Sequence, residues 1–262
     1  MSEPAVNPSA NPGVNHDDRK LGRGPVKKDG RTLKLGKYLK TELPKPPETG
    51  DWTNGITDWG MMLNNVHQCC TIAAAAHAVQ VWTEHTSGET TIPDSLVLKY
   101  YEEWDGYNPS APNTDGGAAA LNVLTAWQKS SFASHKLIAY ADPVLTNLEE
   151  VRQAIHLFGG VYIGLLLPTT AKTQQVWDVV PNGGDDAKPG SWGGHAVFVP
   201  KYDAETFTCI SWGKLYPMTV AFWDTYVDEA HVLLSHNWIE AKGSPSGFDL
   251  EQLKADLGLI HA

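Results

Sequence analysis

Two adjacent cysteines, Cys69 and Cys70, stand where a polar segment meets an alanine-rich run that is typical of a helix. A thiol at the N-terminus of a helix faces unpaired backbone N–H groups and the positive end of the helix dipole, and both favour the reactive thiolate. We therefore predict that Cys70 is a nucleophile. The alternative is that both cysteines are small buried residues, and Cys69, one residue further from the helix, fits that interpretation better.

A thiol nucleophile needs a base that the fold holds beside it, and the chain offers ten histidines. His195 follows a glycine-rich segment and begins an apolar strand, so a sheet would hold its ring while the glycines leave room for a substrate. His77 lies roughly 10 Å along the helix from Cys70, too far for a direct hydrogen bond, and His67 lies in a loop. We predict that His195 is the base; the alternative is a strand-end histidine without a catalytic role.

The segment from Leu43 to Val79 resembles the mature N-terminus of papain-like cysteine peptidases. The shared features are a proline-containing start, an Asp-Trp pair, an amide side chain and, six residues after it, a cysteine that begins the central helix. In this chain they are Leu43–Pro44, Asp51–Trp52, Asn64 and Cys70. Further on, the strand Gly193–Gly194–His195–Ala196–Val197 and then Ser211–Trp212–Gly213 match the family. The similarity covers residues 43–240 and is greatest to poorly characterised bacterial or phage members.

This resemblance implies a role for each matched residue. Cys70 attacks a carbonyl carbon, and His195 takes the thiol proton and later protonates the leaving group. The Cys70 backbone N–H and an amide side chain hold the oxyanion. The family uses Gln for that amide, and Asn64 is one methylene shorter, so either the loop lies closer or the oxyanion hole is weaker. The alternative for Asn64 is a loop residue that caps a turn.

The third catalytic position departs from the family. An Asn that orients the histidine stands directly before Ser-Trp-Gly in the family, whereas this chain has Ile210, which cannot accept a hydrogen bond. Ser211 or Thr208 can take over after a strand shift, or a backbone carbonyl can orient the ring. Otherwise the site is impaired.

Hydrophobic periodicity predicts the elements that position these residues. Helices are expected over 70–85, 95–104 after an Asp94 cap, 117–128 and 148–158. Strands are expected over 161–167, 195–202, 206–212 and 230–236, with a short helix over 222–229. Helices first and antiparallel strands second indicate an α+β fold. The resemblance implies an N-terminal helical subdomain, with the cysteine-bearing helix packed against a C-terminal β-sheet or barrel subdomain.

Charge divides the chain into a flexible basic arm, residues 1–42, and a papain-like domain, residues 43–262. Residues 1–50 carry a net charge of about +4 and the remainder about −14. An acidic body disfavours a nucleic acid substrate. The arm either contacts a partner or assembly, or it is solvated, or it lies across its own acidic body.

The cysteines form no disulfide framework and no zinc-site spacing, so neither a cofactor nor a metal is expected. No apolar run reaches membrane-spanning length, and none marks an N-terminal signal. We therefore expect a cytoplasmic protein without membrane contact, or a virion-associated one if it is phage-derived.

Three functions remain open. The first is hydrolysis or transfer at an amide or peptide bond of a peptide or protein substrate through a Cys70 thioester. The second is a catalytically impaired structural or binding protein that assembles through its N-terminal arm. The third is an exported amidase acting on cell-wall peptides.

Overall fold

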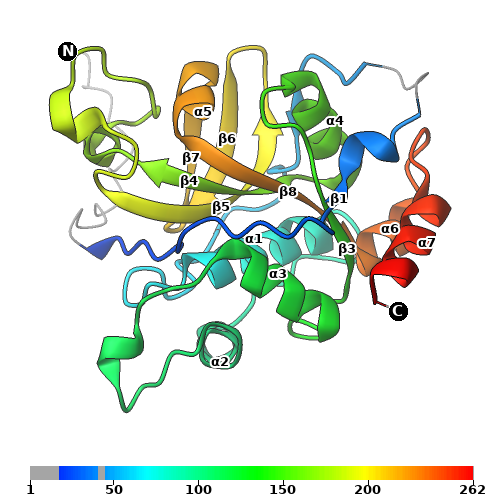
Figure 1. Ribbon diagram of the computed structural model, residues 1–262, viewed down its shortest axis with the longest axis horizontal. Helices are drawn as coiled ribbons and strands as arrows, with labels where there is room; N and C mark the ends of the chain where they lie inside the picture. Colours follow the sequence, from blue (N-terminus) through cyan, green and yellow to red (C-terminus); the bar gives the residue numbers. More distant parts are fainter. Residues whose placement is uncertain (1–17, 41–44, 262) are drawn as a thin grey trace, which may run out of the picture.

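An eight-stranded sheet with helices on both faces forms the framework of the computed structural model, which describes residues 18–40 and 45–261 (Figure 1). β1 and β3 are parallel, and the other paired strands are antiparallel. The spatial order is β1 (Leu33–Lys34), β3 (Leu137–Asp142), β8 (Val227–Ser235), β4 (Val161–Leu167), β5 (Gly193–Tyr202), β6 (Thr206–Ser211) and β7 (Lys214–Thr219), with β2 (Gly50–Asp51) paired to β5.

One face of the sheet packs against α1 (Cys70–Glu84) and α3 (Ala120–Lys129), and α2 (Asp94–Asp105) packs on these two helices; all three lie below the strands in Figure 1. Every residue of α1 from Cys70 to Thr83 is buried. The alanines in this helix let it approach β5 closely, because they add little side-chain volume between helix and strand. The predicted helix 70–85 is confirmed, and its first residue is Cys70.

The other face packs against α4 (Leu148–Phe158) and α5 (Val220–Tyr226). The Asn147 side chain accepts the Glu150 N–H at the start of α4, and Gly159 ends the helix with φ 79°. The predicted helix over 148–158 and strand over 161–167 have the bounds of α4 and β4.

The α+β prediction is confirmed, but helices and strands are less segregated along the chain than expected. β3 lies between α3 and α4 in sequence. β7 is an edge strand of the sheet, which is why it can contain Pro217, a residue without a backbone N–H. The short helix expected over 222–229 is α5, and β8 begins at Val227, so those bounds were wrong. Two further helices, α6 (His236–Lys242) and α7 (Leu250–His261), were not predicted.

Residues 18–40 of the predicted arm lie on the body. β1 joins the sheet, and Leu35 and Tyr38 are buried in the same apolar cluster as α4. The Tyr38 hydroxyl donates to Asp256 at 2.8 Å. The expected boundary at residue 42, and Leu43–Pro44 of the resemblance, lie outside the described residues.

Short 3₁₀ turns complete the fold: η2 (Leu35–Lys37), η3 (Pro112–Thr114), η4 (Thr169–Thr173) and η5 (Gly184–Ala187). In the part of the chain that the structure describes, no helix combines the length and apolarity needed to cross a bilayer.

Candidate active site

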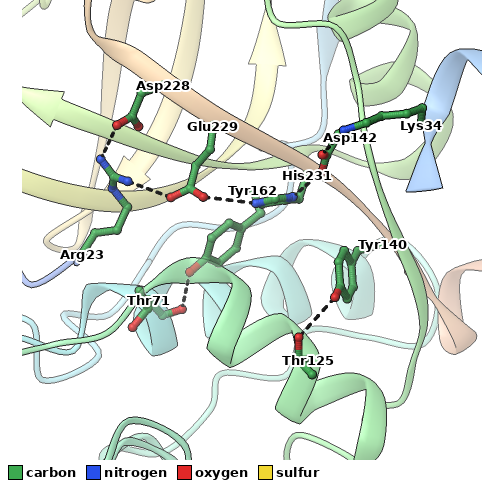
Figure 2. A network of polar contacts seen from close by, with 10 residues as sticks. All are labelled: Arg23, Lys34, Thr71, Thr125, Tyr140, Asp142, Tyr162, Asp228, Glu229 and His231. Carbon is green, nitrogen blue, oxygen red and sulfur yellow. Dashed lines mark hydrogen bonds and ion pairs between the residues drawn. The ribbon is translucent and has the colours of Figure 1, made fainter. Parts of the chain in front are cut away.

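Cys70 is the first residue of α1, and its backbone belongs to the turn whose N–H groups have no partner within the helix. The backbone N–H of Ala196 in β5 interacts with its thiol. The Tyr162 hydroxyl of β4 donates to the Thr71 carbonyl at 3.0 Å, which fixes the first turn of α1 against the sheet (Figure 2). The sheet therefore positions the cysteine-bearing end of the helix directly.

His195 lies near the start of β5, immediately before the residue that contacts Cys70. Its Nε2 lies 2.7 Å from Ser211 Oγ, and its ring stacks on Trp212 with centroids 4.3 Å apart and planes 10° apart. Its buried Nδ1 makes no hydrogen bond with any described residue. When Nε2 donates to the Ser211 hydroxyl, Nδ1 carries a lone pair, which is the protonation state that a general base requires.

The strand alternation of β6 explains how the ring is held without the family's asparagine. Ile210 is buried in the helix-side cluster and pairs with Phe198, whereas Ser211 points to the face of His195. Thr208 lies on the Ile210 face. Of the partners that the sequence allowed, the structure pairs Ser211 with His195.

Asn64 lies in the loop before α1 and is 2% exposed. The side-chain Nδ2 of Asn64 donates to the His67 backbone carbonyl at 3.2 Å, and the backbone carbonyl of Asn64 accepts the Lys20 N–H. In this state the amide side chain stabilises the loop. Its assignment to an oxyanion hole stays a prediction.

The other histidines considered as bases have different partners. His77 Nε2 lies 2.9 Å from the Trp59 carbonyl, and burial lowers its pKa to about 4. His67 Nδ1 lies 3.2 Å from Asp115. In residues 18–40 and 45–261, no group of His, Cys, Asp or Glu side chains is arranged to hold a metal ion.

Residues 19–24, which we call the covering segment, run between the helical part and the sheet beside this constellation (Figure 1). The Gly22 and Arg23 N–H groups both donate to the Gly194 carbonyl at 3.1 Å, and Trp212 Nε1 donates to the Lys20 carbonyl at 3.0 Å. On the helical side, the Ala118 N–H donates to Gly22 and the Gly24 N–H donates to Ala118. The segment thus bridges both walls of the site.

The covering segment approaches the walls so closely that side chains are excluded. Gly22 has φ 138°, and a Cβ there would meet the Gln68 carbonyl oxygen at 2.0 Å. A Cβ on Gly194 would meet the Arg23 carbonyl oxygen at 2.2 Å, and one on Gly117 would meet the Gly22 oxygen at 1.7 Å. Glycine is required at all three contacts.

Burial under this cover controls the charge of the site. Burial raises the pKa of the Cys70 thiol to about 12, although the Ala196 N–H and the Arg23 charge oppose the shift. Burial lowers the pKa of His195 to about 3, and the charges of Arg23 and Arg19 add to that shift. Desolvation is therefore the dominant cause for both groups, and both are neutral near pH 7.

The covering segment was only weakly predictable from the sequence, and the acidic residues that bind Arg23 were not predictable at all. The charge asymmetry allowed the arm to lie across the acidic body, which is where residues 19–24 lie. Arg23 binds Asp228 and Glu229, but these acids are more than two hundred residues away in sequence and stand in no recognisable motif.

The chain matches no family model, and no curated protein matches it. Solved structures do match. Xylellain, a cysteine protease from Xylella fastidiosa, is 16% identical with a TM-score of 0.63, over 82% of this chain and 97% of that one. Procathepsin B S9 from Trypanosoma congolense is 10% identical with a TM-score of 0.58, over 84% and 88%. Digestive procathepsin L 3 of Tenebrio molitor larval midgut is 11% identical with a TM-score of 0.55, over 83% and 76%. The chain therefore has the papain-like fold.

Proposed function

We propose that this chain is a cysteine-dependent hydrolase of amide or peptide bonds, with Cys70 as nucleophile and His195 as base. The observation that carries the proposal is the state of the imidazole. Its Nε2 bonds to Ser211, its Nδ1 has no hydrogen-bond partner among residues 18–40 and 45–261, and Ala196, the next residue of β5, interacts with the Cys70 thiol. A strand-end histidine without a catalytic role would need neither a buried polar partner nor an aromatic ring stacked on it.

The proposed reaction uses these groups in turn. His195 Nδ1 accepts the Cys70 proton while the sulfur attacks the carbonyl carbon of the scissile amide. The oxyanion of the tetrahedral intermediate is stabilised by the Cys70 backbone N–H and, once the loop rearranges, by Asn64. His195 then protonates the leaving amine as the C–N bond breaks, which leaves a thioester. Water, deprotonated by His195, hydrolyses the thioester and restores the thiol.

The covering segment keeps this hydrolase latent. A substrate backbone needs the space between Gln68 and Gly194, and residues 19–24 already fill it. When the segment leaves, water reaches both reacting groups and the desolvation penalty on the thiolate and imidazolium falls. Activity then depends on release of a part of the chain that does not itself react.

A second candidate is a catalytically impaired structural or binding protein. The firm attachment of the covering segment favours this candidate. The segment is followed by β1, which pairs with the sheet, and by the buried Leu35 and Tyr38, which fix it to the body. In that case the site is sealed permanently, and the arm serves assembly instead.

The full-length Gly22→Ala variant separates the two candidates. A methyl group at position 22 meets the Gln68 backbone, so the segment must move away, whereas Gly30→Ala meets nothing within 4 Å and serves as the matched control. The variants are screened for turnover of a broad peptide library, with Gly22→Ala/Cys70→Ala as the blank. We expect Cys70-dependent cleavage by Gly22→Ala only. Absence of cleavage, with Cys70 open to alkylation, would favour the impaired protein.

A further inference from the structure

Arg23 of the covering segment extends into an acidic pocket at the start of β8. Its Nη1 lies 2.8 Å from Glu229 Oε1, and its Nη2 lies 2.8 Å from Asp228 Oδ2 (Figure 2). The Arg23 side chain is fully buried, and the Glu229 side chain is 5% exposed. Two charge-assisted hydrogen bonds in a desolvated site form one of the strong polar contacts of proteins.

We propose that this pocket, formed by Asp228 and Glu229, recognises an arginine side chain of a peptide that takes the place of the covering segment. This inference rests on the proposed function in one respect, since the bound peptide is a substrate only if the chain is a hydrolase. The hydrolase would then select peptides with arginine at this position. Arg23 occupies the pocket as a stand-in for that side chain.

The surroundings of Glu229 show that the pocket is organised for a cation. Its second oxygen faces His231 Nε2 at 3.4 Å, His231 Nδ1 lies 2.7 Å from Asp142, and Asp142 pairs with Lys34 at 2.6 Å (Figure 2). Acids and bases alternate along this chain of contacts. With Arg23 in place, three cations face three carboxylates; without it, the carboxylates are in excess by one.

Glu229 is 5% exposed when Arg23 fills the pocket, so a ligand that covers the pocket without bringing a positive charge leaves this carboxylate buried and unpaired, which is costly. His231 cannot supply it, since it is already shared between Glu229 and Asp142. The pocket therefore distinguishes a basic ligand side chain from an apolar one by the cost of leaving Glu229 unpaired.

The shape of the pocket favours arginine in particular. Gly164 of β4 forms one wall, and a Cβ there would lie 2.4 Å from Glu229 Oε1 and 2.7 Å from Arg23 Cδ. The missing side chain makes room for the arginine methylenes beside the glutamate. The two carboxylates then receive the two ends of one planar guanidinium, a geometry that a lysine ammonium does not reproduce.

The pocket also lies at the reacting groups. The Arg23 N–H binds the Gly194 carbonyl, one residue before His195, and the Arg23 charge acts on the Cys70 thiol. A peptide that places arginine here consequently passes beside Cys70, as a substrate must.

Peptide binding to the full-length Gly22→Ala/Cys70→Ala protein tests the pocket without requiring turnover. The probe is a synthetic peptide of residues 18–25, and the test peptide carries citrulline in place of Arg23. The charge-matched control carries Lys20→Gln, because the Lys20 side chain is exposed. By calorimetry, we expect the citrulline peptide to bind about tenfold more weakly or worse, and the Lys20→Gln peptide to bind within about twofold of the parent.

Two variants of the protein provide a matched test and control for the same pocket. Glu229→Gln should remove most of the preference for arginine, and Asp185→Asn, at a 91% exposed side chain, should leave it intact. Equal affinity for the arginine and citrulline peptides, or no binding of either, overturns the inference. Arginine-selective binding without cleavage of any arginine peptide by Gly22→Ala would instead reject the hydrolase and leave the pocket standing.

Arg23→Ala gives a second route that does not depend on displacing the backbone. We expect ethylguanidinium to raise the thermal midpoint of this variant and its neutral isostere ethylurea not to do so. Identical responses to the two compounds contradict the inference.

Discussion

Ser211 and His195 form a buried hydrogen bond of 2.7 Å between adjacent antiparallel strands, on the face of β6 opposite Ile210. A hydroxyl, one of the two that the sequence analysis offered as replacements, takes the place of the asparagine amide that the family has before Ser-Trp-Gly. Because the hydroxyl can donate as well as accept, it holds the imidazole tautomer less strictly than an amide oxygen would.

Removal of this hydroxyl should therefore impair catalysis more than folding. In the Gly22→Ala background we expect Ser211→Ala to lower kcat/KM by about tenfold to a hundredfold, with a shifted pH profile, because the ring loses its orientation. Thr208→Val, on the other face of β6, is the control and should change little. Equal losses in both variants would mean that Ser211 is only a packing residue.

Alkylation of Cys70 should report the cover directly. Since burial holds the pKa of this thiol at about 12, the wild-type protein should react with iodoacetamide slowly up to about pH 10. In Gly22→Ala the reactive range should move to lower pH, and His195→Ala should move it back. Peptide mass spectrometry distinguishes Cys70 from the buried Cys69 and Cys209. Fast labelling of wild-type Cys70 at pH 7 would contradict the covered state.

His231 should make stability depend on pH. Burial opposes its charge, but hydrogen bonds with Asp142 and Glu229 outweigh burial and raise its pKa above 6.5. The folded state therefore holds the proton more tightly, so the contribution is complete below pH 6.5 and is lost as pH rises through the folded-state pKa. We expect His231→Gln to lower the free energy of unfolding by about 3 kcal/mol at pH 6 and by less at pH 9.

Urea denaturation at the two pH values measures this difference. His236→Gln, which removes a half-exposed histidine from the surface of α6, is the control and should cost little at either pH. An effect of His231→Gln that is independent of pH would show that the imidazole is neutral in the fold.

Asp105 should make stability depend on pH in a lower range. Burial raises its pKa to about 7, against a hydrogen bond from Thr71. The folded state thus favours the protonated acid, and the free energy of unfolding falls as pH rises from about 4 to about 7. Asp105→Asn should remove that decline, and it should gain at least about 1 kcal/mol relative to wild type between pH 4 and pH 8. Asp224→Asn, on the exposed side of α5, should run parallel to wild type. A parallel curve for Asp105→Asn would mean that the carboxyl is ionised in the fold.

The local elements were predictable where a strong period coincides with clear end signals. The segment from Asn147 to Gly159 shows this, because a capping side chain and a left-handed glycine delimit a helix of the predicted length. The helix that begins at Cys70 has neither end signal and was predicted from its alanine run alone. β3 and β7 were missed because each is only partly buried. Their pairing is decided by neighbouring strands, not by their own pattern.

The candidate site was predictable only in part, for a related reason. Cys70 and His195 stand at recognisable element ends, so spacing and residue type single them out. The choice of Ser211 over Thr208 depends on which face of β6 meets the ring, and one residue of register reverses that face. The contact of Arg23 with Glu229 spans 206 residues, and no local signal encodes it.

The carbonyl oxygen of Gly194 accepts two N–H groups of the covering segment at once, so both of its lone pairs are engaged. An incoming peptide cannot share this oxygen and cannot exchange stepwise with the segment. Under the proposed function, the segment must therefore open before a peptide binds. Raising the peptide concentration should not bring turnover by the wild-type protein up to that of Gly22→Ala.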